Sequence, residues 1–202
     1  MKVAQLDYDH NFSTAIALEI PVMKKKSFAD MPCPIALSLE HVSDGWNILI
    51  LRDMSYGLSR FDEFEKSLGI AASTLTRRLN GLIESGLVEK HTYSDKPPRY
   101  DYVLTESGRD FRPVVLTLMK WGSKHFSPGG SNIELIDEAS GKPVDLVLVD
   151  ANSGKRINMH DHSLRYKGPS ESISAWRLEA GRARWDAYRN ALPPSQPLQL
   201  NR

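Results

Sequence analysis

Apolar residues recur at helical spacing within residues 71–88. They stand at positions i, i+4, i+7 and i+8, which predicts a single apolar stripe along one helix. The stripe consists of Leu75, Leu79, Leu82 and Ile83. Gly86 follows as a residue that ends the helix, and the next two apolar residues begin a strand. The pattern therefore predicts a helix that leads directly into β-structure.

The opposite face of this helix is polar. At about 100° per residue, four side chains fall on the side away from the stripe or beside it. They are Ser73, Thr76, Arg77 and Asn80. Hydroxyl, amide and guanidinium groups suit base edges and phosphates, so this face is a candidate DNA-recognition surface. A solvated helix face is the alternative interpretation of the same pattern.

Two helices are expected before this stretch. Pro34 suits the first turn of a helix that continues to about Val42. Residues 43–45, Ser-Asp-Gly, break that run and offer a cap. A second helix, over residues 46–57, is apolar nearly all round and is therefore expected to be buried.

A third, short helix is predicted by a capping box. Residues 59–62 have the Ser-x-x-acid pattern, and the helix is expected to run to Leu68, with Gly69 in the following turn. Two helices joined by a short glycine-containing turn form a helix-turn-helix. Arg60 lies at a helix N-terminus, where the helix dipole favours phosphate, and Arg78 points to the side of the recognition helix. Both are candidate phosphate contacts.

A β-hairpin is expected after the helix-turn-helix. Residues 88–93 and 100–104 are rich in β-branched and aromatic side chains, and residues 94–99 form the turn between them. Lys96 and Arg99 at this tip could reach an adjacent minor groove. The helices and the hairpin together predict a winged helix-turn-helix in an α+β, mainly α, fold.

A long helix is expected to follow the hairpin. Thr105 is its predicted cap, and the helix is expected to run from Glu106 to about Phe126 with a kink at Pro113. Its side chains are more apolar than one face of a single domain requires. This surplus leaves an apolar surface to be covered.

The C-terminal third contains an internal repeat. Residues 149–157 repeat residues 136–144, and each copy reads as strand, Asx-type turn and strand. A last helix with several arginines follows; it could contact DNA flanks or pack on its own body. The expected organisation is an N-terminal extension (1–29), a winged helix-turn-helix domain (30–126), a two-hairpin module (127–168), and a basic C-terminal helix and tail (169–202).

The composition restricts the function classes. The formal net charge is +1, so DNA binding must depend on where the cations lie rather than on overall charge. A single cysteine excludes an intramolecular disulfide framework and suits a reducing cytosol. No apolar run reaches the roughly 18 residues of a membrane span, and the protein is expected to be cytoplasmic. Residues 1–22 are expected to be an extension without a fold of their own, or to precede the natural start of the protein. A short helix that lies on the body is the alternative.

Catalytic and metal-binding patterns are absent from the sequence. It has no nucleophile triad, paired carboxylates or glycine-rich phosphate loop, so neither an enzyme nor a cofactor is expected. His160 and His162 flank an aspartate without a third ligand nearby, and a polar loop is expected there instead of a metal site.

Seven motifs occur in order between residues 33 and 108. They are CPIA (33–36), WNILILR (46–52), RFDEF (60–64), LTRRL (75–79), GLVE (86–89), PPRYDY (97–102) and LTESG (104–108). Together they resemble the HxlR family of bacterial winged helix-turn-helix regulators, relatives of the MarR type, over residues 33–125. The resemblance implies a homodimer joined through its first and long helices, which presents two recognition helices to a pseudo-palindromic operator.

The resemblance also bears on the C-terminal repeat. Some family members carry a small zinc-ribbon-like module at this place. In this sequence Asp137, Ser140, Asp150 and Ser153 stand at the cysteine positions, and they cannot form a tetrahedral thiolate site. The module is therefore expected to be metal-free.

Cys33 corresponds to a cysteine that senses oxidants or electrophiles in several family members. A thiol near a helix N-terminus has a lowered pKa, and the thiolate is the reactive form. Cys33 is thus a candidate for redox sensing, with an ordinary packed cysteine as the alternative.

The sequence therefore predicts a dimeric DNA-binding transcriptional regulator, a repressor. Its expected partners are double-stranded DNA, a second copy and a small-molecule or electrophile effector, without a membrane. The alternative is a winged-helix module for protein interaction or for redox or small-molecule sensing, with weak or no specific DNA binding.

Overall fold

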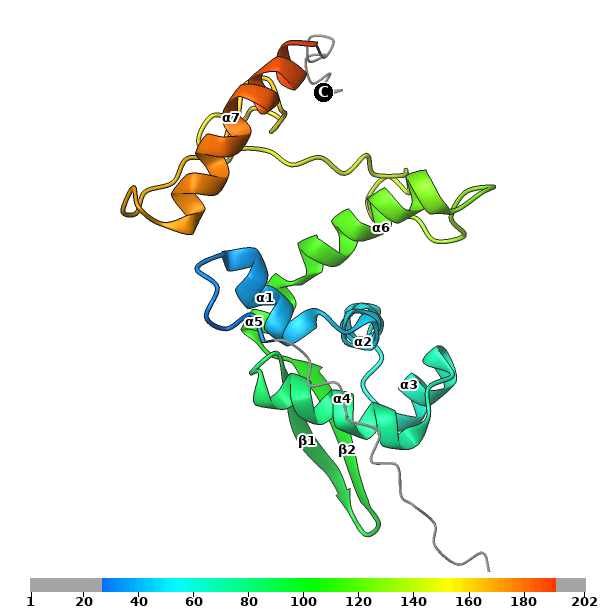
Figure 1. Ribbon diagram of the computed structural model, residues 1–202. Coiled ribbons are helices and arrows are strands. Elements are labelled where there is room, and N and C mark those ends of the chain that lie inside the picture. Colours follow the sequence, from blue (N-terminus) through cyan, green and yellow to red (C-terminus); the bar gives the residue numbers. More distant parts are fainter. Residues whose placement is uncertain (1–26, 192–202) are drawn as a thin grey trace, which may run out of the picture.

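The computed structural model of this chain describes residues 27–191, and the expectations for residues 1–22 lie outside them. It combines helices with one two-stranded antiparallel hairpin that projects from the helical body, which confirms the predicted fold class (Figure 1). The elements are α1 (Pro34–Val42), α2 (Gly45–Ser55), α3 (Phe61–Leu68), α4 (Ala72–Glu84), β1 (Val88–Asp95), β2 (Pro98–Leu104), α5 (Glu106–Asp110), α6 (Arg112–Phe126) and α7 (Ile173–Ala191).

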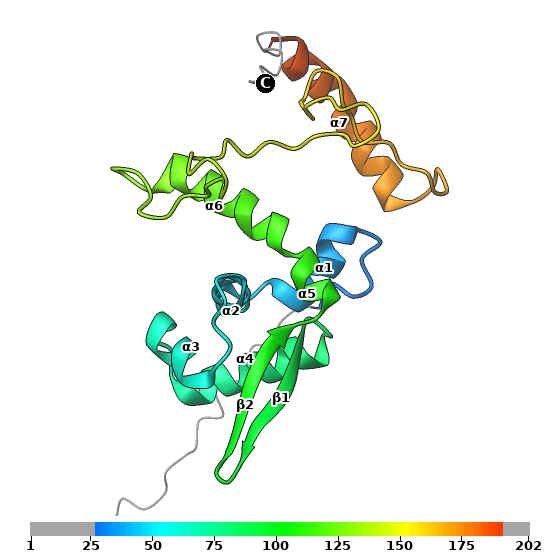
Figure 2. The same cartoon turned by 180° about the vertical axis from the view of Figure 1, so that it is seen from behind.

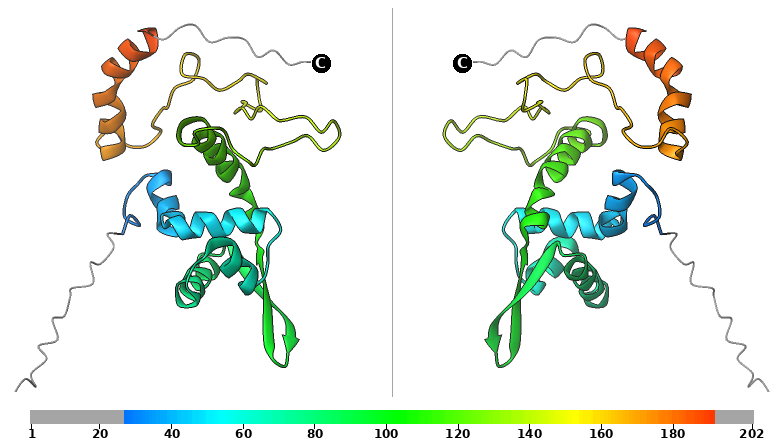
Figure 3. Two further views of the ribbon diagram at one scale, coloured as in Figure 1. Left: turned by 90° about the vertical axis from the view of Figure 1, so that its right-hand side faces the viewer. Right: turned by 90° about the vertical axis from the view of Figure 1, so that its left-hand side faces the viewer.

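Helix α2 forms the centre of the winged domain. It contacts α1, α3, α4, α6 and β2, and Figure 3 shows it between α4 and α6. Ile50 and Leu51 on α2 are almost fully buried, as the all-round apolar pattern predicted. They meet Phe64 of α3 and the apolar stripe of α4 in one core. Burial of these side chains is the main force that fixes α4 on the domain.

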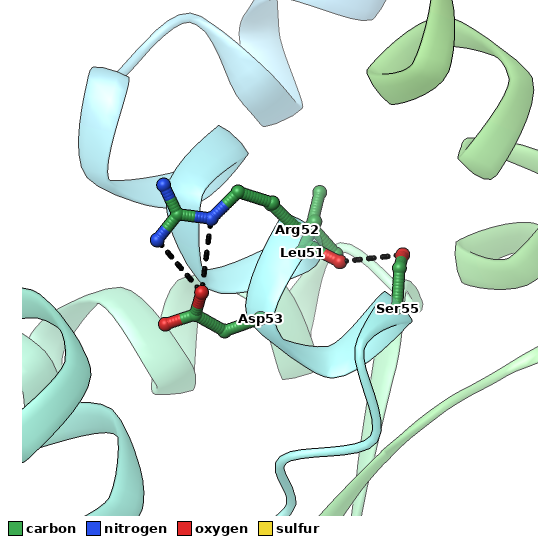
Figure 4. Close-up of polar contacts among 4 residues, drawn as sticks. All are labelled: Leu51, Arg52, Asp53 and Ser55. Carbon is green, nitrogen blue, oxygen red and sulfur yellow. Dashed lines mark hydrogen bonds and ion pairs between the residues drawn. The ribbon is translucent and has the colours of Figure 1, made fainter. Parts of the chain in front are cut away.

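Two charged groups shape α2. Asp44 caps its N-terminus, since its side chain accepts a hydrogen bond from the Trp46 N–H at 3.0 Å. Asp53 is buried in the last turn of the helix, where Arg52 donates to its Oδ1 from both Nε and Nη2 (Figure 4). This pairing compensates for removing a carboxylate from water.

The capping box of α3 differs by one residue from the prediction. Glu63, rather than Asp62, accepts hydrogen bonds from the backbone N–H groups of Ser59 and Arg60, both at 2.9 Å. These two bonds lower the pKa of the Glu63 carboxyl. The Ser59 hydroxyl instead donates to Asp101 of β2 at 2.9 Å. The Ser59 side chain, which the local pattern assigned to the cap of α3, therefore binds the hairpin instead.

Helix α4 ends as predicted and turns directly into β1. Gly86 has a φ of +69°, a left-handed conformation that favours glycine. The N–H groups of Gly86 and Leu87 donate to Ile83 and Leu82, which closes the last turn. Strands β1 and β2 then pair from Val88 opposite Leu104. The strands extend beyond the predicted residues, so the tip is a tight turn.

The predicted long helix is instead two helices separated at Phe111. Thr105 caps the first of them, α5, by accepting a hydrogen bond from the Gly108 N–H at 3.1 Å. Pro113 lies in the first turn of α6. Because proline has no N–H and its ring clashes with the carbonyl four residues earlier, the helix ends and restarts there rather than bending.

The repeated segments of the C-terminal third form two equivalent turns. The N–H groups of Asp137 and Asp150 donate to Lys142 and Lys155, both at 2.9 Å. Each turn is held by an isolated bridge pair instead of the longer strands that were expected. The chain then enters α7, which Figures 1 and 2 show at the end of the molecule opposite the hairpin tip. No helix in the described range has the length and apolar character required to cross a bilayer.

Candidate nucleic-acid interface

The polar face of α4 is open to solvent. Ser73, Thr76, Arg77 and Asn80 are all exposed, because the buried apolar stripe holds the other side of the helix against the core. The side chains of Arg77 and Asn80 form no hydrogen bond or ion pair with the described residues. Thr76 donates its hydroxyl hydrogen bond back to the carbonyl of Ala72. These side chains are thus available to an external partner.

Arg78 is positioned differently from its neighbours. Its Nη2 lies 2.6 Å from Oδ2 of Asp44, and only 23% of the Arg78 side chain is exposed. Its buried Nε has no hydrogen-bond partner in the part of the chain that the structure describes. Since Asp44 also caps α2, this ion pair joins α4 to the N-terminus of the central helix.

Arg60 lies where α3 meets the hairpin. Its Nε is 3.7 Å from Oδ1 of Asp101, and its guanidinium lies 4.9 Å from the ring centre of Tyr93. A hollow of about 470 Å³ brings Arg60 and Arg99 to the same surface, together with Tyr93 and Tyr100. Lys96 is exposed at the hairpin tip, outside this hollow.

Sequence reasoning missed the tyrosines of this junction. Tyr93 and Tyr100 flank the hairpin tip, and the nitrogen of Lys90 lies 3.6 Å from the ring centre of Tyr100. Aromatic residues interleaved with cations were the available signal, since such rings attract and orient cationic side chains. Figure 3 shows α4 and the hairpin projecting on the same side of α2.

Cys33 is a half-buried residue at the N-terminus of α1. The backbone N–H groups of Ala36 and Ile35, at the start of the helix, lower the pKa of the Cys33 thiol, and the charge of Arg177 acts in the same direction. The Ser174 hydroxyl of α7 donates to the carbonyl of neighbouring Pro32 at 3.1 Å. The thiol therefore lies close to the junction of α1 and α7.

We expect Cys33 to react with iodoacetamide at lower pH than an ordinary cysteine. Because the thiolate is the nucleophile and the pKa of Cys33 is lowered, the midpoint of the rate–pH profile should fall below that of an ordinary thiol such as glutathione. Mass spectrometry of the alkylated protein measures this rate without ambiguity, since the chain has one cysteine. Arg177→Gln should move the midpoint upward. A wild-type midpoint at or above that of glutathione would contradict the expectation.

The four residues at the ribbon-like positions are engaged with one another. The hydroxyl of Ser140 donates to Asp137 at 2.7 Å, and that of Ser153 donates to Asp150 at 2.5 Å. These hydrogen bonds lower the pKa of both carboxyls. Within residues 27–191, no cluster of three or more His, Cys, Asp or Glu side chains could hold a metal ion. His162 accepts a hydrogen bond from the Asn158 N–H at 3.3 Å.

Helices α1 and α6 carry large apolar side chains that a single chain leaves in solvent. On α1, Ile35 is 73% exposed. On α6, Trp121 is 53% exposed, and Val114 and Leu118 are also exposed. Residues 114, 118 and 121 are spaced by four and three, so they form one stripe along α6. Helices with such unburied stripes commonly pack against a partner.

The sequence of this chain is similar to those of helix-turn-helix transcriptional regulators. The family model for HxlR-like helix-turn-helix proteins matches residues 41–129. The uncharacterized HTH-type transcriptional regulator Rv3095 of Mycobacterium tuberculosis is 37% identical over 124 residues, which are 61% of this chain and 78% of the relative. YdeP of Bacillus subtilis, another uncharacterized HTH-type transcriptional regulator, is 34% identical over 94 residues, 46% of this chain and 73% of the relative.

Solved structures give the same result. The crystal structure of PA1607, a candidate transcription factor, is 33% identical with a TM-score of 0.63, and the match covers 70% of this chain and all of that one. PA1374 from Pseudomonas aeruginosa, also a candidate transcription factor, is 44% identical with a TM-score of 0.50, over 70% of this chain and 97% of that one. These relatives are named as regulators of transcription, and none of them is named as an enzyme. The chain therefore belongs to the HxlR-like helix-turn-helix family of transcriptional regulators.

Proposed function

We propose that the protein is a homodimeric repressor that binds a pseudo-palindromic DNA operator through α4. The observation that carries this proposal is the exposed polar face of α4, opposite an apolar stripe in which Leu75, Leu79 and Leu82 are buried. In the proposed complex α4 enters the major groove, where Arg77 donates to a guanine edge and Asn80 pairs with an adenine edge. Ser73 and Thr76 supply further hydrogen bonds to bases or phosphates.

Contacts with the DNA backbone are assigned to the hairpin side of the domain. Arg60 and Arg99 share one hollow, and we assign both to phosphates next to the recognition helix. Lys96 at the exposed tip is assigned to the neighbouring minor groove. Arg78 contacts phosphate only through the quarter of its side chain left open, and its ion pair with Asp44 keeps α4 in a fixed orientation on α2.

The homodimer is supported by the apolar side chains of α1 and α6. Their exposure in a single chain leaves apolar area that a second copy would bury. A symmetric dimer presents two copies of α4, and two half-sites spaced by a helical turn of DNA would match them. Repression needs only occupancy of the operator, so it requires no surface beyond those of DNA binding and dimerisation.

Fluorescence anisotropy tests the proposal. The full-length protein is titrated on its own upstream DNA and on a scrambled duplex, each at two salt concentrations. We expect tight binding that favours the upstream fragment and weakens steeply with salt, because phosphate contacts release counterions. Weak binding without preference would contradict the proposal and favour the second candidate, a protein-interaction module. The net charge of +1 is the observation that favours this candidate.

An effector completes the proposed function. Cys33 is the proposed site for an oxidant or electrophile, since its thiol pKa is lowered and it lies beside the α1 surface of the proposed dimer. Treatment with a quinone should then modify Cys33 and change the affinity for DNA. Unchanged affinity in the presence of a confirmed Cys33 adduct would remove this role and leave the DNA-binding proposal untouched.

A further inference from the structure

The C-terminal unit contains the larger of the two hollows described here. A pocket of about 900 Å³ lies between α7 and the segment that precedes it, residues 157–164. Ligand pockets commonly measure about 300–1,000 Å³. None of the α7 residues is buried, so the protein's own side chains leave this space unfilled. The segment runs beside α7 in Figure 1.

Hydrogen bonds within the segment fix the pocket wall that residues 157–164 form. Asn158 holds this segment together, because its side-chain oxygen accepts hydrogen bonds from the N–H groups of His160 and Asp161, both at 2.8 Å. The Asn158 side chain also donates to the Asp161 carboxylate. Such a self-bonded turn gives the pocket a defined shape before any ligand binds.

Large apolar side chains supply most of the lining. They come from both walls and include Ile157, Met159, Leu164, Leu178, Trp185 and Tyr188. Trp185 and Tyr188 lie one turn apart on α7 with ring centres 5.9 Å apart. A flat aromatic or aliphatic body would replace water along this wall.

The charges around the pocket are predominantly positive. Arg182 pairs with Glu179 at 3.5 Å, and Arg189 pairs with Asp186 at 2.9 Å. Arg177 and Arg184 also line the pocket but have no carboxylate partner within residues 27–191; Arg184 donates to a backbone carbonyl. Two uncompensated guanidinium groups beside an apolar wall select a ligand with an acidic group.

We propose that this pocket binds a small amphipathic anion, namely an aromatic ring system that carries one carboxylate or sulfonate. The apolar wall would take the ring, and Arg177 or Arg184 would take the acidic group. Because Arg177 also lies near Cys33 and Ser174 bonds to Pro32, the ligand would act at the start of α1. Only this regulatory consequence rests on the proposed function; binding itself does not.

Binding is tested without DNA, using the full-length protein and the fluorescent probe 8-anilinonaphthalene-1-sulfonate. We expect one saturable site per chain. The anion 2-naphthoate should displace the probe about tenfold better than the neutral, similarly shaped 2-naphthamide, because only the acid can pair with arginine. Arg184→Gln should reduce this preference. Equal displacement by the two compounds, or binding that does not saturate, would overturn the proposal.

A matched pair of substitutions on α7 locates the site. Gly181 lines the pocket, and a Cβ added there meets nothing within 4 Å, so Gly181→Leu should extend into the pocket without a clash at its first carbon. Ala183 is exposed and outside the lining, so Ala183→Leu adds a side chain elsewhere on the same helix. We expect about a tenfold loss of probe affinity in the first variant and none in the second.

Two results of this comparison would overturn the proposal. An equal loss in both variants, with unchanged circular dichroism, would mean that the probe binds α7 in general. A lower oligomeric state of Gly181→Leu in light scattering would mean that a second copy of the chain fills the pocket. Specific operator binding is measured separately by anisotropy, so a failure of the pocket and a failure of the DNA-binding proposal remain distinguishable.

Discussion

Leu118→Glu is expected to separate the proposed dimer into monomers and to lower operator affinity by about 10²–10⁴-fold. Leu118 lies in the middle of the exposed α6 stripe, between Val114 and Trp121. A glutamate there would place two carboxylates in a surface that should be apolar and dry, at a cost that the contact cannot offset. Because a monomer engages one half-site at a time, the gain from simultaneous binding is lost. Light scattering measures the mass, and anisotropy measures the affinity.

Lys124→Glu is the matched control for this variant. Lys124 is exposed on the same helix but lies about a quarter of a turn from the stripe, so the variant adds negative charge without entering the proposed interface. It should remain dimeric. The monomer of Leu118→Glu should keep its fold, because the side chain is 43% exposed in a single chain. A Leu118→Glu protein that stays dimeric would show that α6 does not form the interface.

Local patterns were sufficient to predict helix α4 and its two faces. The stripe of α4, its end at Gly86 and the exposed positions 73, 77 and 80 all follow from helical periodicity and from one glycine that adopts a positive φ. These features depend on neighbours within a few residues, so the sequence contains all the information they require. The same holds for the cap of α2, which was expected within residues 43–45 and is Asp44.

Contacts between distant residues could not be predicted in the same way. Ser59 has the chemistry of a cap, yet its hydroxyl bonds to Asp101, 42 residues further along. Arg78 similarly meets Asp44 across two helices, which leaves it less available than its neighbour Arg77. Tertiary contacts override local preference at both positions, because each side chain has a stronger partner in the folded protein.

The break between α5 and α6 could be predicted only in part from the sequence. Pro113 gave a clear local signal, but the pattern was consistent with either a kink or a new helix. Packing decides between them: Gly108 lies so close to the Leu87 carbonyl that an added Cβ would overlap it. With α5 held against the start of the hairpin, α6 needs its own direction to reach α2. The helix is therefore interrupted because α5 packs against the hairpin and α6 packs against α2.

The Arg77→Ala variant is expected to lose about 1–3 kcal/mol of operator binding at each half-site. Because the proposed dimer places two copies of α4 on the DNA, the loss per dimer should reach about 2–6 kcal/mol. Stability should change by less than about 0.5 kcal/mol, since Arg77 is exposed and has no partner within the described residues. Anisotropy on operator and scrambled duplex measures the first effect, and thermal denaturation measures the second.

Arg165→Ala separates base recognition from simple loss of charge. Arg165 is also exposed and lies in the C-terminal third, and its replacement by alanine removes the same single charge. It should leave the ratio of operator to scrambled affinity unchanged, whereas Arg77→Ala should lower that ratio, because a bidentate contact with a base edge discriminates between sequences and a phosphate contact does not. If Arg77→Ala weakens both duplexes equally, Arg77 binds phosphate. If it weakens neither, α4 is not the helix that enters the major groove.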